Sequence, residues 1–365
     1  MLRVGINARS LAKPNPTGVS RYTRGLLTAL TARSDEIEYV VFGIDSLPDE
    51  IAANERPVKL ADSAPIHSGP RAHYWEQFVL PRRLSRYDID VFHTPGGQPP
   101  LLAREPLVTT IHDISPITHP EWFTRKYVAL YRALTPLAIR VSNQIITVSE
   151  FTADEVASRY PSAMKKTTPI YNGVTQPPSG GCTPDEELTS EQFLLFVGSI
   201  NPRKNLDGLL CSYRRYRDRV TNPLPLVLVG PSRDVFASIG LSSKEGVHVF
   251  GFVPDKQLGW LYRNASALVY PSLYEGFGLP ILEAMSVRTP VLTSDRGAMA
   301  EVAGDAAYLA DPSNPSEVAT GIERIVGDDP FTRDLVEAGK RRATLFTWEH
   351  TAEQTVNTYE RAADQ

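Results

Sequence analysis

The sequence predicts an α/β protein made of two doubly wound domains. Short apolar runs alternate with helix-like segments along the whole chain, which is typical of parallel sheets covered by helices. The apolar runs are nearly continuous, as expected for strands that are buried on both faces. A stretch rich in proline, glycine and charge, Thr175–Gln192, divides the 365 residues into two halves of similar size.

Within this plan the first domain spans residues 1–178, a linker spans 179–192, and the second domain spans 193–345. Residues 346–365 are predicted to form one further helix, because apolar and small side chains recur there at three- and four-residue spacing. Ligands of doubly wound sheets bind beyond the carboxyl ends of the strands. Two such domains facing each other would therefore enclose a cleft.

The expected elements follow the chain in order. In the first half, strands are predicted at Leu2–Asn7, Tyr39–Ile44, Val91–Thr94, Leu107–His112, Gln144–Ser149 and Thr168–Tyr171. In the second half, they are predicted at Phe193–Gly198, Leu226–Val229, Val247–Phe250, Ala267–Tyr270, Val291–Ser294 and Tyr308–Ala310. Helices are predicted between them at Ser20–Ala32, Phe123–Val141, Thr152–Tyr160, Leu206–Arg219 and Asp255–Asn264.

The composition indicates a globular protein with substantial cores. Hydrophobic residues make up 42% of the chain, and the net charge of −4 argues against bulk binding of nucleic acid. Two cysteines give no disulfide framework, so we expect a reducing, cytoplasmic compartment. No apolar run reaches the roughly 18 residues that a membrane span needs, and the N-terminus lacks the apolar core of a signal peptide.

Two carboxylates, Glu275 and Glu283, stand on either side of two glycines and a proline. Gly276 and Gly278 predict a tight loop, or a close approach of another molecule to the backbone. Pro280 fits the first turn of a helix, where its missing N–H costs nothing. We therefore expect Glu275 at the loop tip and Glu283 early in the helix, lining one mouth that suits a ligand with hydroxyls and negative charge. The alternative is a pair of ordinary surface acids.

Two cations, Arg203 and Lys204, precede the helix that is predicted to begin near Asn205, a plausible N-cap. Positive charge at the amino end of a helix opposes the helix dipole. A bound diphosphate would resolve this conflict by accepting hydrogen bonds from the helix N–H groups, the guanidinium and the ammonium. The alternative is a pair of solvated charges in a loop.

In the first half, His112 and Asp113 end an apolar strand, the position at which doubly wound domains bind ligands. His119 and Glu121 follow on the next loop. The alternative for His112 is a histidine held by a hydrogen bond at a strand end. Gly18 precedes a helix after the first strand and could meet a phosphate, although the sequence has neither a G-x-G-x-x-G fingerprint nor a P-loop lysine pattern.

A segment from His73 to Tyr87 mixes apolar residues, among them Trp75, with three arginines. It predicts either contact with an anionic membrane surface or a lipid-linked acceptor, or an amphipathic helix with a solvated basic face. Pro81 interrupts the helical pattern and favours the second interpretation.

These residues together resemble the retaining glycosyltransferases of family 4, which have the GT-B fold. The blocks in the order R-K-N (residues 203–205) and E-x7-E (275–283) are the specific part of this likeness. The weaker matches are the glycine loop at Gly18, I-H-D at His112, T-V-S-E at Ser149, Y-N-G-V at Asn172, V-F-G-F-V at Phe250–Val253 and the final F-T-W-E-H-T-A.

The resemblance implies two Rossmann-like domains, with the donor bound by the second, the acceptor mostly by the first, and the last helix crossing back to the first domain. It implies that Glu283 holds the ribose of a sugar nucleotide, Glu275 the donor sugar, and Arg203 and Lys204 the diphosphate. His112 is expected beside the anomeric carbon. Donor contacts are also expected at Gly18, Gly198, Ser199, Gly276, Phe277, Gly278 and Leu279, and acceptor contacts at Trp75, His119 and Glu121.

One departure from the family pattern concerns the diphosphate. Many relatives carry arginine directly after the V-G of the R-K-N block, whereas this chain has Ser199, so the expectation rests more on Arg203. The form S-I-N-P-R-K-N looks like a subgroup rich in mannosyltransferases of surface glycans.

The resemblance therefore implies a retaining hexosyltransferase that uses a GDP- or UDP-sugar, with GDP-mannose the expected donor, and a glycan or lipid-linked acceptor. No metal or other cofactor is expected, since the family's departing diphosphate takes the acceptor's proton. The expected location is the cytoplasm or the inner face of the cell membrane. Two alternatives stay open: an epimerase or phosphorylase of the same fold, and a carbohydrate-binding subunit without activity.

Overall fold

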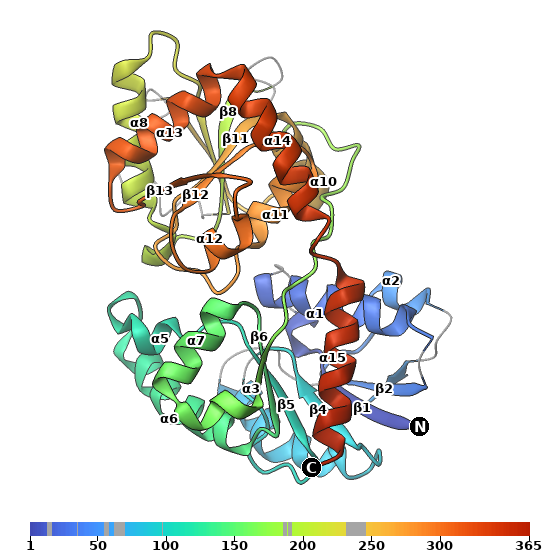
Figure 1. Cartoon of the computed structure of the whole chain (residues 1–365). Coiled ribbons are helices and arrows are strands. Elements are labelled where there is room, and N and C mark those ends of the chain that lie inside the picture. The colour runs from blue at the N-terminus through green and yellow to red at the C-terminus, as the bar shows by residue number, and fades with distance from the viewer. Residues whose placement is uncertain are drawn as a thin grey trace. The chain divides into compact units, whose positions relative to one another are not determined.

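The computed structural model contains two compact units (Figure 1). Unit 1 comprises Met1–Gly173 together with Thr347–Gln365, and unit 2 comprises Val174–Phe346. The structure describes residues 1–12, 17–34, 36–54, 58–61, 70–96, 98–184, 188, 192–230 and 246–365. The two doubly wound domains predicted from the sequence are confirmed.

Within the described residues, unit 1 has a seven-stranded parallel sheet in the order β3-β2-β1-β4-β5-β6-β7. Its strands are β1 (Leu2–Asn7), β2 (Ile37–Phe42), β3 (Lys59–Leu60), β4 (Val91–Thr94), β5 (Leu107–Ile111), β6 (Gln144–Thr147) and β7 (Thr167–Pro169). The predicted strands are confirmed to within a few residues. The short edge strand β3 was not predicted, because two exposed residues leave no apolar run to detect.

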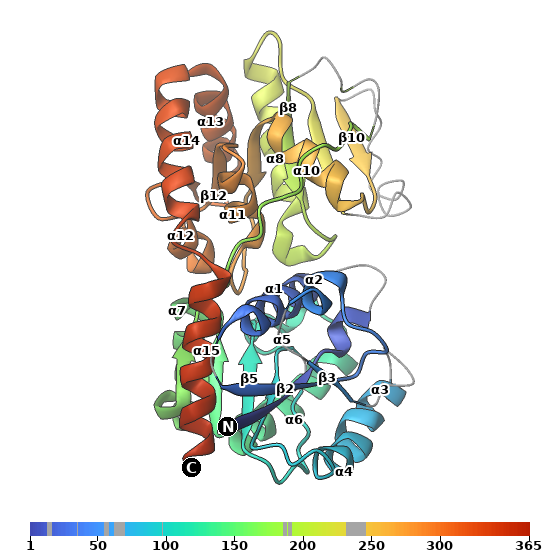
Figure 2. The same ribbon diagram turned by 90° about the vertical axis from the view of Figure 1, so that its right-hand side faces the viewer.

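The helices of unit 1 cover both faces of this sheet. They are α1 (Gly18–Ala32), α2 (Asp49–Ala52), α3 (Pro70–Tyr74), α4 (Leu80–Leu84), α5 (Ser115–Thr118), α6 (Arg125–Val141), α7 (Glu150–Arg159) and α15 (Trp348–Ala363). Parallel crossovers are right-handed, and α1 leads toward the β3 edge whereas α6 leads toward the β7 edge. The two helices therefore lie on opposite faces, and α15 packs beside α1 over β4, β5 and β6 (Figure 2).

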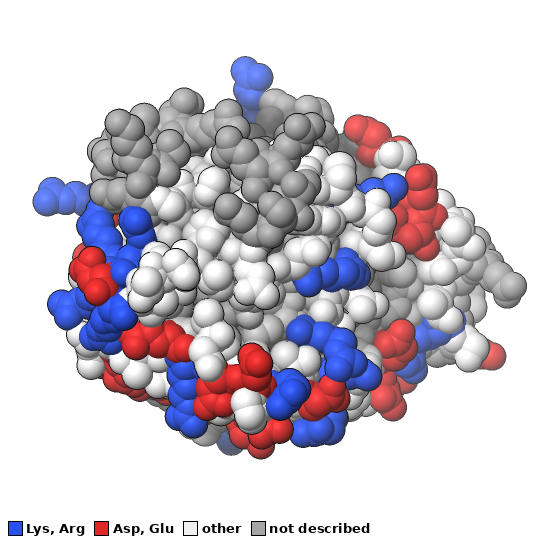
Figure 3. Space-filling view, turned by 90° about the horizontal axis from the view of Figure 1, so that it is seen from above, with Lys and Arg blue, Asp and Glu red and all other residues white. Residues whose placement is uncertain are grey.

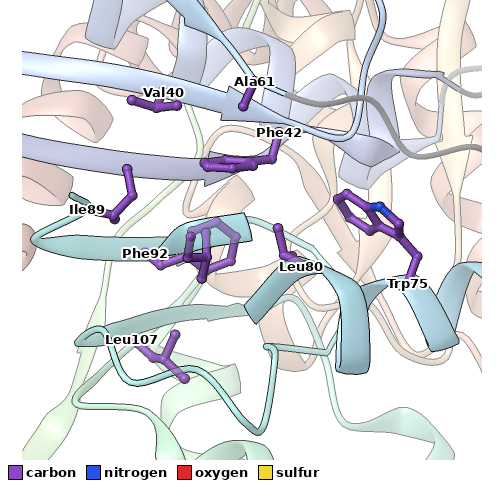
Figure 4. Close-up of a cluster of buried hydrophobic side chains, with 9 residues drawn as sticks. Val40, Phe42, Ala61, Trp75, Leu80, Ile89, Phe92 and Leu107 are labelled. Atoms are coloured by element: carbon purple, nitrogen blue, oxygen red, sulfur yellow. The ribbon is translucent and has the colours of Figure 1, made fainter. Parts of the chain in front are cut away.

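The segment His73–Tyr87 continues as a helix through Pro81, contrary to the predicted interruption. A π-helical turn, η2 (Trp75–Val79), joins α3 to α4, and Pro81 is the second residue of α4, directly after this turn. Leu80 points into a core cluster that also holds Trp75 (Figure 4), and Leu84 belongs to the same cluster. The remaining members of the cluster are Val40, Phe42, Ala61, Ile89, Phe92 and Leu107.

Helix α15 returns from the end of unit 2 to complete unit 1, as the family resemblance implied. Its first residue, Trp348, lies directly against Gly25 of α1 and against Gly173. A Cβ atom on either glycine would stand 2.2 or 2.4 Å from Trp348 atoms, so only glycine fits at both positions. The hydroxyl of Thr351 donates to the carbonyl of Tyr171 at 2.7 Å.

Unit 2 has, within its described residues, a six-stranded parallel sheet in the order β10-β9-β8-β11-β12-β13. The strands are β8 (Phe193–Val197), β9 (Leu226–Val229), β10 (Val247–Phe250), β11 (Ala265–Tyr270), β12 (Val291–Ser294) and β13 (Tyr308–Ala310), all at predicted positions. Its helices are α8 (Leu206–Arg219), α10 (Asp255–Asn264), α11 (Leu279–Ser286), α12 (Gly297–Ala303), α13 (Pro315–Gly327) and α14 (Asp329–Ala343).

The predicted linker, 179–192, comes after residues that already pack on unit 2. Arg263 of α10 donates to the carbonyl of Pro178 at 2.7 Å, and Gly181 lies against the backbone of Lys256. Residues 185–187 and 189–191 of the linker lie outside the described residues. The change of unit therefore comes at Gly173, before the proline- and glycine-rich stretch.

Candidate functional site

The loop between β8 and α8 carries the predicted cations in a 3₁₀ turn, η6 (Pro202–Lys204). Asn201 shapes this turn by accepting from the backbone N–H of Arg203 at 3.1 Å. Asn205 follows in a left-handed conformation, with φ of 56°. It occupies the N-cap position of α8, but its side chain does not cap the helix as predicted. The amide donates instead to the carbonyls of Pro271 at 3.0 Å and Pro312 at 2.8 Å, which joins three loops at one end of the sheet.

The loop between β11 and α11 lies against this turn. The N–H of Leu273 donates to the carbonyl of Arg203 at 2.7 Å. Gly278 has φ of 105°, a conformation that favours glycine, and Pro280 lies in the first turn of α11. The predicted tight loop and helix start are therefore confirmed. Both loops follow the carboxyl ends of adjacent strands, where α/β sheets bind their ligands.

Glu275 joins the two predicted cations into one buried cluster. Its carboxylate accepts from Arg203 Nη1 at 2.8 Å and pairs with Lys204 Nζ at 2.5 Å. Glu275 lies in the predicted loop but is only 5% exposed, and Lys204 is 7% exposed, so the alternative of two solvated cations was wrong. The burial of Glu275 was not predicted, because the two cations that stabilise its buried charge come from another loop.

Tyr270, the last residue of β11, completes the cluster. Its hydroxyl donates to Glu275 Oε1 at 2.9 Å and accepts from Lys204 Nζ, which also lies 4.7 Å from the centre of the Tyr270 ring. The tyrosine thereby fixes the ammonium and the carboxylate relative to each other. It was missed because it ends an apolar run that predicts core, although a buried tyrosine hydroxyl needs a partner.

The charges of the cluster leave one positive charge in excess. Burial by itself would raise the pKa of Glu275, but Lys204 and Arg203 lower that pKa below its usual range, so the carboxylate is ionised at neutral pH. Burial, followed by the charge of Glu275, raises the pKa of Tyr270 well above its usual value. One carboxylate faces two cations, and this excess of positive charge suits an anion.

Glu283 lies on α11, the helix that follows the loop carrying Glu275, and is 6% exposed. Its Oε2 accepts from the hydroxyl of Tyr262 on α10 at 2.8 Å. Tyr262 is a second functional candidate that the sequence did not reveal, since it lies within the buried face of an amphipathic helix. The bond fixes one oxygen of a carboxylate that has several acceptor positions.

The remaining predicted donor residues surround these groups. Gly198 directly follows β8 and lies beside Lys204, where an added Cβ would lie 3.5 Å from the lysine side chain, and Ser199 is exposed. Gly276 and Phe277 are buried, and the Phe277 ring meets Phe346 edge to face at 5.9 Å. Leu279 begins α11. Thus the structure brings the predicted donor residues of unit 2 together.

In unit 1, His112 follows the end of β5. Its Nε2 donates to the carbonyl of Pro95 at 2.7 Å, which leaves the proton off Nδ1 when the ring is neutral. Burial lowers the pKa of His112 more than Pro95 and Asp113 raise it, so the ring is neutral at physiological pH. Tyr22 packs edge to face on the imidazole, with ring centres 4.9 Å apart.

Near His112, a buried chain of hydrogen bonds between uncharged groups runs across two neighbouring strands of the sheet. Tyr22 on α1 meets Thr110 at 3.2 Å, Thr110 meets Nε2 of His93 at 2.8 Å, and Nδ1 of His93 meets the hydroxyl of Tyr359 on α15 at 2.7 Å. Burial, followed by the proximity of His112, lowers the pKa of His93 to about 3. The chain therefore ties helices on one face to the strands that carry His112.

The other predicted residues of unit 1 have different surroundings. Gly18 is the first residue of α1, after the capping Thr17, with open space around it. His119 pairs with Glu121 at 3.2 Å and stacks on Trp122, and both members of the pair are accessible to solvent. Trp75, in contrast, is 5% exposed within the core cluster, so its indole stabilises unit 1 and gives no surface for an acceptor (Figure 4).

Among the described residues, His, Cys, Asp and Glu side chains form no group of three or more that could hold a metal ion. Unit 2 thus carries the cationic cluster, and unit 1 separately carries a neutral histidine at a strand end.

Two family models match this chain. Residues 184–342 match the model described as glycosyl transferases group 1, and residues 16–175 match the model described as glycosyltransferase family 4. Together they span both units.

Several curated proteins are similar along most of the chain. The O-antigen chain mannosyltransferase B of Escherichia coli is 32% identical over 94% of this chain and 96% of that protein. The MMP alpha-(1->4)-mannosyltransferase of Mycolicibacterium hassiacum is 30% identical over 70% of this chain and 66% of that protein.

Solved structures share the fold. A sucrose-phosphate synthase from Thermosynechococcus elongatus has a TM-score of 0.75 at 20% identity, with 99% of this chain and 98% of that chain covered. The Anabaena protein HepE, solved in complex with UDP and glucose, has a TM-score of 0.72 at 19% identity, with 99% and 100% covered.

Proposed function

The chain belongs to the glycosyl transferases group 1, glycosyltransferase family 4, and from this premise we propose that it is a retaining hexosyltransferase. It moves mannose from GDP-mannose to a hydroxyl of a glycan or lipid-linked acceptor in the synthesis of a surface polysaccharide. The observation that carries the proposal is the buried cluster of Arg203, Lys204 and Glu275, whose excess positive charge suits a diphosphate.

The cluster and Glu283 divide the donor between them. Arg203 and Lys204 hold the diphosphate, the group on which negative charge develops as the sugar leaves. Glu283, oriented by Tyr262, accepts hydrogen bonds from the ribose hydroxyls. Glu275 orients both cations and contacts the hydroxyls of the donor sugar.

The reaction forms a bond between the anomeric carbon and the acceptor oxygen while the bond to the diphosphate breaks on the same face. The departing diphosphate takes the acceptor's proton, so no metal or protein base is needed. Groups placed where charge develops lower the barrier most, which assigns the main catalytic role to Lys204 and Arg203. His112 is neutral and lies beside the anomeric carbon, where it positions the sugar without adding charge.

The choice of mannose is supported by the names of the two relatives above, both mannosyltransferases. HepE was solved in complex with UDP and glucose, so a UDP-sugar is the second donor to test. The nucleotide base and the sugar of the preferred donor are therefore the first properties to determine.

The test is a thermal-shift and turnover screen of the purified chain against GDP-mannose, UDP-glucose and their free nucleotides, because a ligand specific to the native state raises the melting temperature. GDP-mannose should give the largest shift and, with acceptor, a product whose anomeric configuration by NMR equals that of the donor. An inverted product would overturn the retaining mechanism. Conversion of the donor without acceptor would identify an epimerase, and binding without any turnover a carbohydrate-binding subunit.

A further inference from the structure

Helix α6 of unit 1 exposes an apolar stripe. Tyr127 and Leu130 are each 40% exposed and Leu137 is 45% exposed, while Leu134 is half-buried between them. These four positions follow each other at intervals of three and four residues, so they lie on one side of the helix. The core side of α6 is occupied by other residues, including Val128 and Ile139.

The same helix carries only positive charge. Arg125, Lys126, Arg132 and Arg140 are all exposed, and the segment Arg125–Val141 contains no aspartate or glutamate. An exposed apolar stripe flanked by basic residues alone is the pattern of a helix that lies in the interface of an anionic membrane.

The neighbouring segment on that side of the sheet has the same character. Tyr74 is 61% and Phe78 46% exposed, with their rings 5.2 Å apart. A hollow of about 410 Å³ lies beside Phe78, lined also by Leu102, Arg82 and Arg104. Apolar and cationic groups around one hollow suit the junction between an acyl chain and a phosphate headgroup.

Charge and packing join this segment to α6. Residues 70–87 contain one acidic side chain, Glu76, which is buried and pairs with Arg9 at 2.8 Å, so only cations face outward there. The crossovers β3–β4 and β5–β6 lead in the same direction along the sheet, which puts α4 and α6 on the same face. Val141, at the end of α6, packs against the cluster that holds Leu80 and Leu84.

On the described surface of unit 2, basic side chains pair with acidic ones. Arg219 pairs with Glu323 at 3.0 Å, and Arg288 pairs with Glu337. Figure 3, which views the chain from the side of α8, α13 and α14, shows acidic and basic side chains interspersed.

We propose that the outer layer of unit 1 formed by α6 and the segment 70–87 docks on an anionic lipid surface, with the apolar stripe at the level of the headgroups. Among the described residues no helix is long and apolar enough to cross a membrane, so the contact is peripheral. A second copy of the chain is the less suitable occupant, since two such faces would bring like charges together. The inference rests on exposure and charge alone and does not depend on the sugar or nucleotide used.

The experiment is co-sedimentation of the full chain, without substrates, with vesicles of phosphatidylcholine alone or mixed with phosphatidylglycerol. We expect binding only to the mixed vesicles and a strong loss at high salt, which screens the attraction. The variant Arg132→Gln/Arg140→Gln should weaken binding about fivefold for each arginine removed. Its matched control, Arg333→Gln/Arg341→Gln on α14, should bind as the wild type does.

The apolar half of the proposal is tested by Leu130→Ser/Leu137→Ser, which should weaken binding roughly tenfold or more. The control is Phe252→Ser/Leu345→Ser, exposed apolar residues of unit 2. Equal binding to both kinds of vesicle, or equal losses in variants and controls, would overturn the proposal. So would a dimer in sedimentation that the leucine pair dissociates while vesicle binding is unchanged. If the leucine pair lowers the melting temperature, the arginine pair decides, because those side chains are exposed.

Discussion

The carboxyl ends of the two sheets hold opposite kinds of polar structure. In unit 2 the strand ends carry a buried ionic cluster, Arg203, Lys204 and Glu275, with positive charge in excess. In unit 1 they carry His112 and a buried chain of uncharged hydrogen bonds that ends at Tyr359. Parallel topology determines where ligands bind, and side chains determine which ligand. A charged diphosphate suits the first end, and neutral hydroxyl groups suit the second.

The largest effect that would test this comparison is the loss of the ammonium in unit 2. Lys204→Ala should lower kcat by two to three orders of magnitude, or roughly 2–4 kcal/mol, because the charge developing on the diphosphate loses a preorganised cation. Steady-state kinetics measure this. The control is Lys340→Ala, an exposed lysine of α14, and wild-type turnover in the Lys204 variant would contradict the assignment.

Removal of the second carboxylate of unit 2 should act on binding. Glu283→Ala should weaken the affinity for the nucleotide by roughly 1.5–3 kcal/mol, the range for hydrogen bonds to a charged group. Calorimetric titration with the nucleotide measures it. Tyr262→Phe, which removes only the orienting hydroxyl, should give a smaller loss of the same kind. Unchanged affinity in both variants would remove the ribose role from Glu283.

The stability of the protein at acid pH should depend on the buried chain of uncharged hydrogen-bonding groups in unit 1. The folded pKa of His93, about 3, lies below its ordinary value of 6.5. Between these values the unfolded chain binds the proton and the folded chain does not, so stability rises with pH and is fully present above about pH 6.5. The slope is on the order of 1 kcal/mol per pH unit for one proton. Denaturant melts of wild type and His93→Gln from acid to neutral pH should show a shallower slope in the variant; equal slopes would contradict the neutral buried imidazole.

The smallest expected effect should distinguish a hydroxyl that stabilises the fold from one that contributes to catalysis. Tyr359→Phe removes one hydroxyl from His93 and should lower the free energy of unfolding by roughly 1 kcal/mol, with donor affinity unchanged. The matched change in unit 2, Tyr270→Phe, should lower kcat, because that hydroxyl contacts both Lys204 and Glu275. Equal effects of the two variants on kcat would end the distinction between the units.

Much of the fold was predictable because short stretches of the sequence specify its strands and turns. Parallel strands buried on both faces appear as continuous apolar runs, and twelve predicted runs became strands. The exposed pair Lys59–Leu60 has no such signal. Gly278 and Pro280 marked the loop and helix start for the same local reason.

The sequence indicated candidate residues of the site, but it did not indicate that they would be buried against one another. Glu275 is buried because Arg203 and Lys204, about seventy positions earlier, lie against it, and no local pattern records that contact. Tyr270 and Tyr262 were hidden for the opposite reason, since their apolar surroundings predict core alone. The stripe on α6 has the periodicity of a core-facing helix, and only the exposure of its side chains in the fold distinguishes it.

The return of α15 to unit 1 has a consequence for biosynthesis. Trp348 fills the space over Gly25 and Gly173, and Tyr359 bonds to His93, so the core of unit 1 closes only with residues made after all of unit 2. Domains generally fold in the order in which they leave the ribosome. Here the order is reversed: unit 2 is a continuous stretch that can fold first, while unit 1 waits with an open sheet face until α15 emerges. A premature stop a few codons before residue 348 would therefore spare unit 2 and leave unit 1 unfinished.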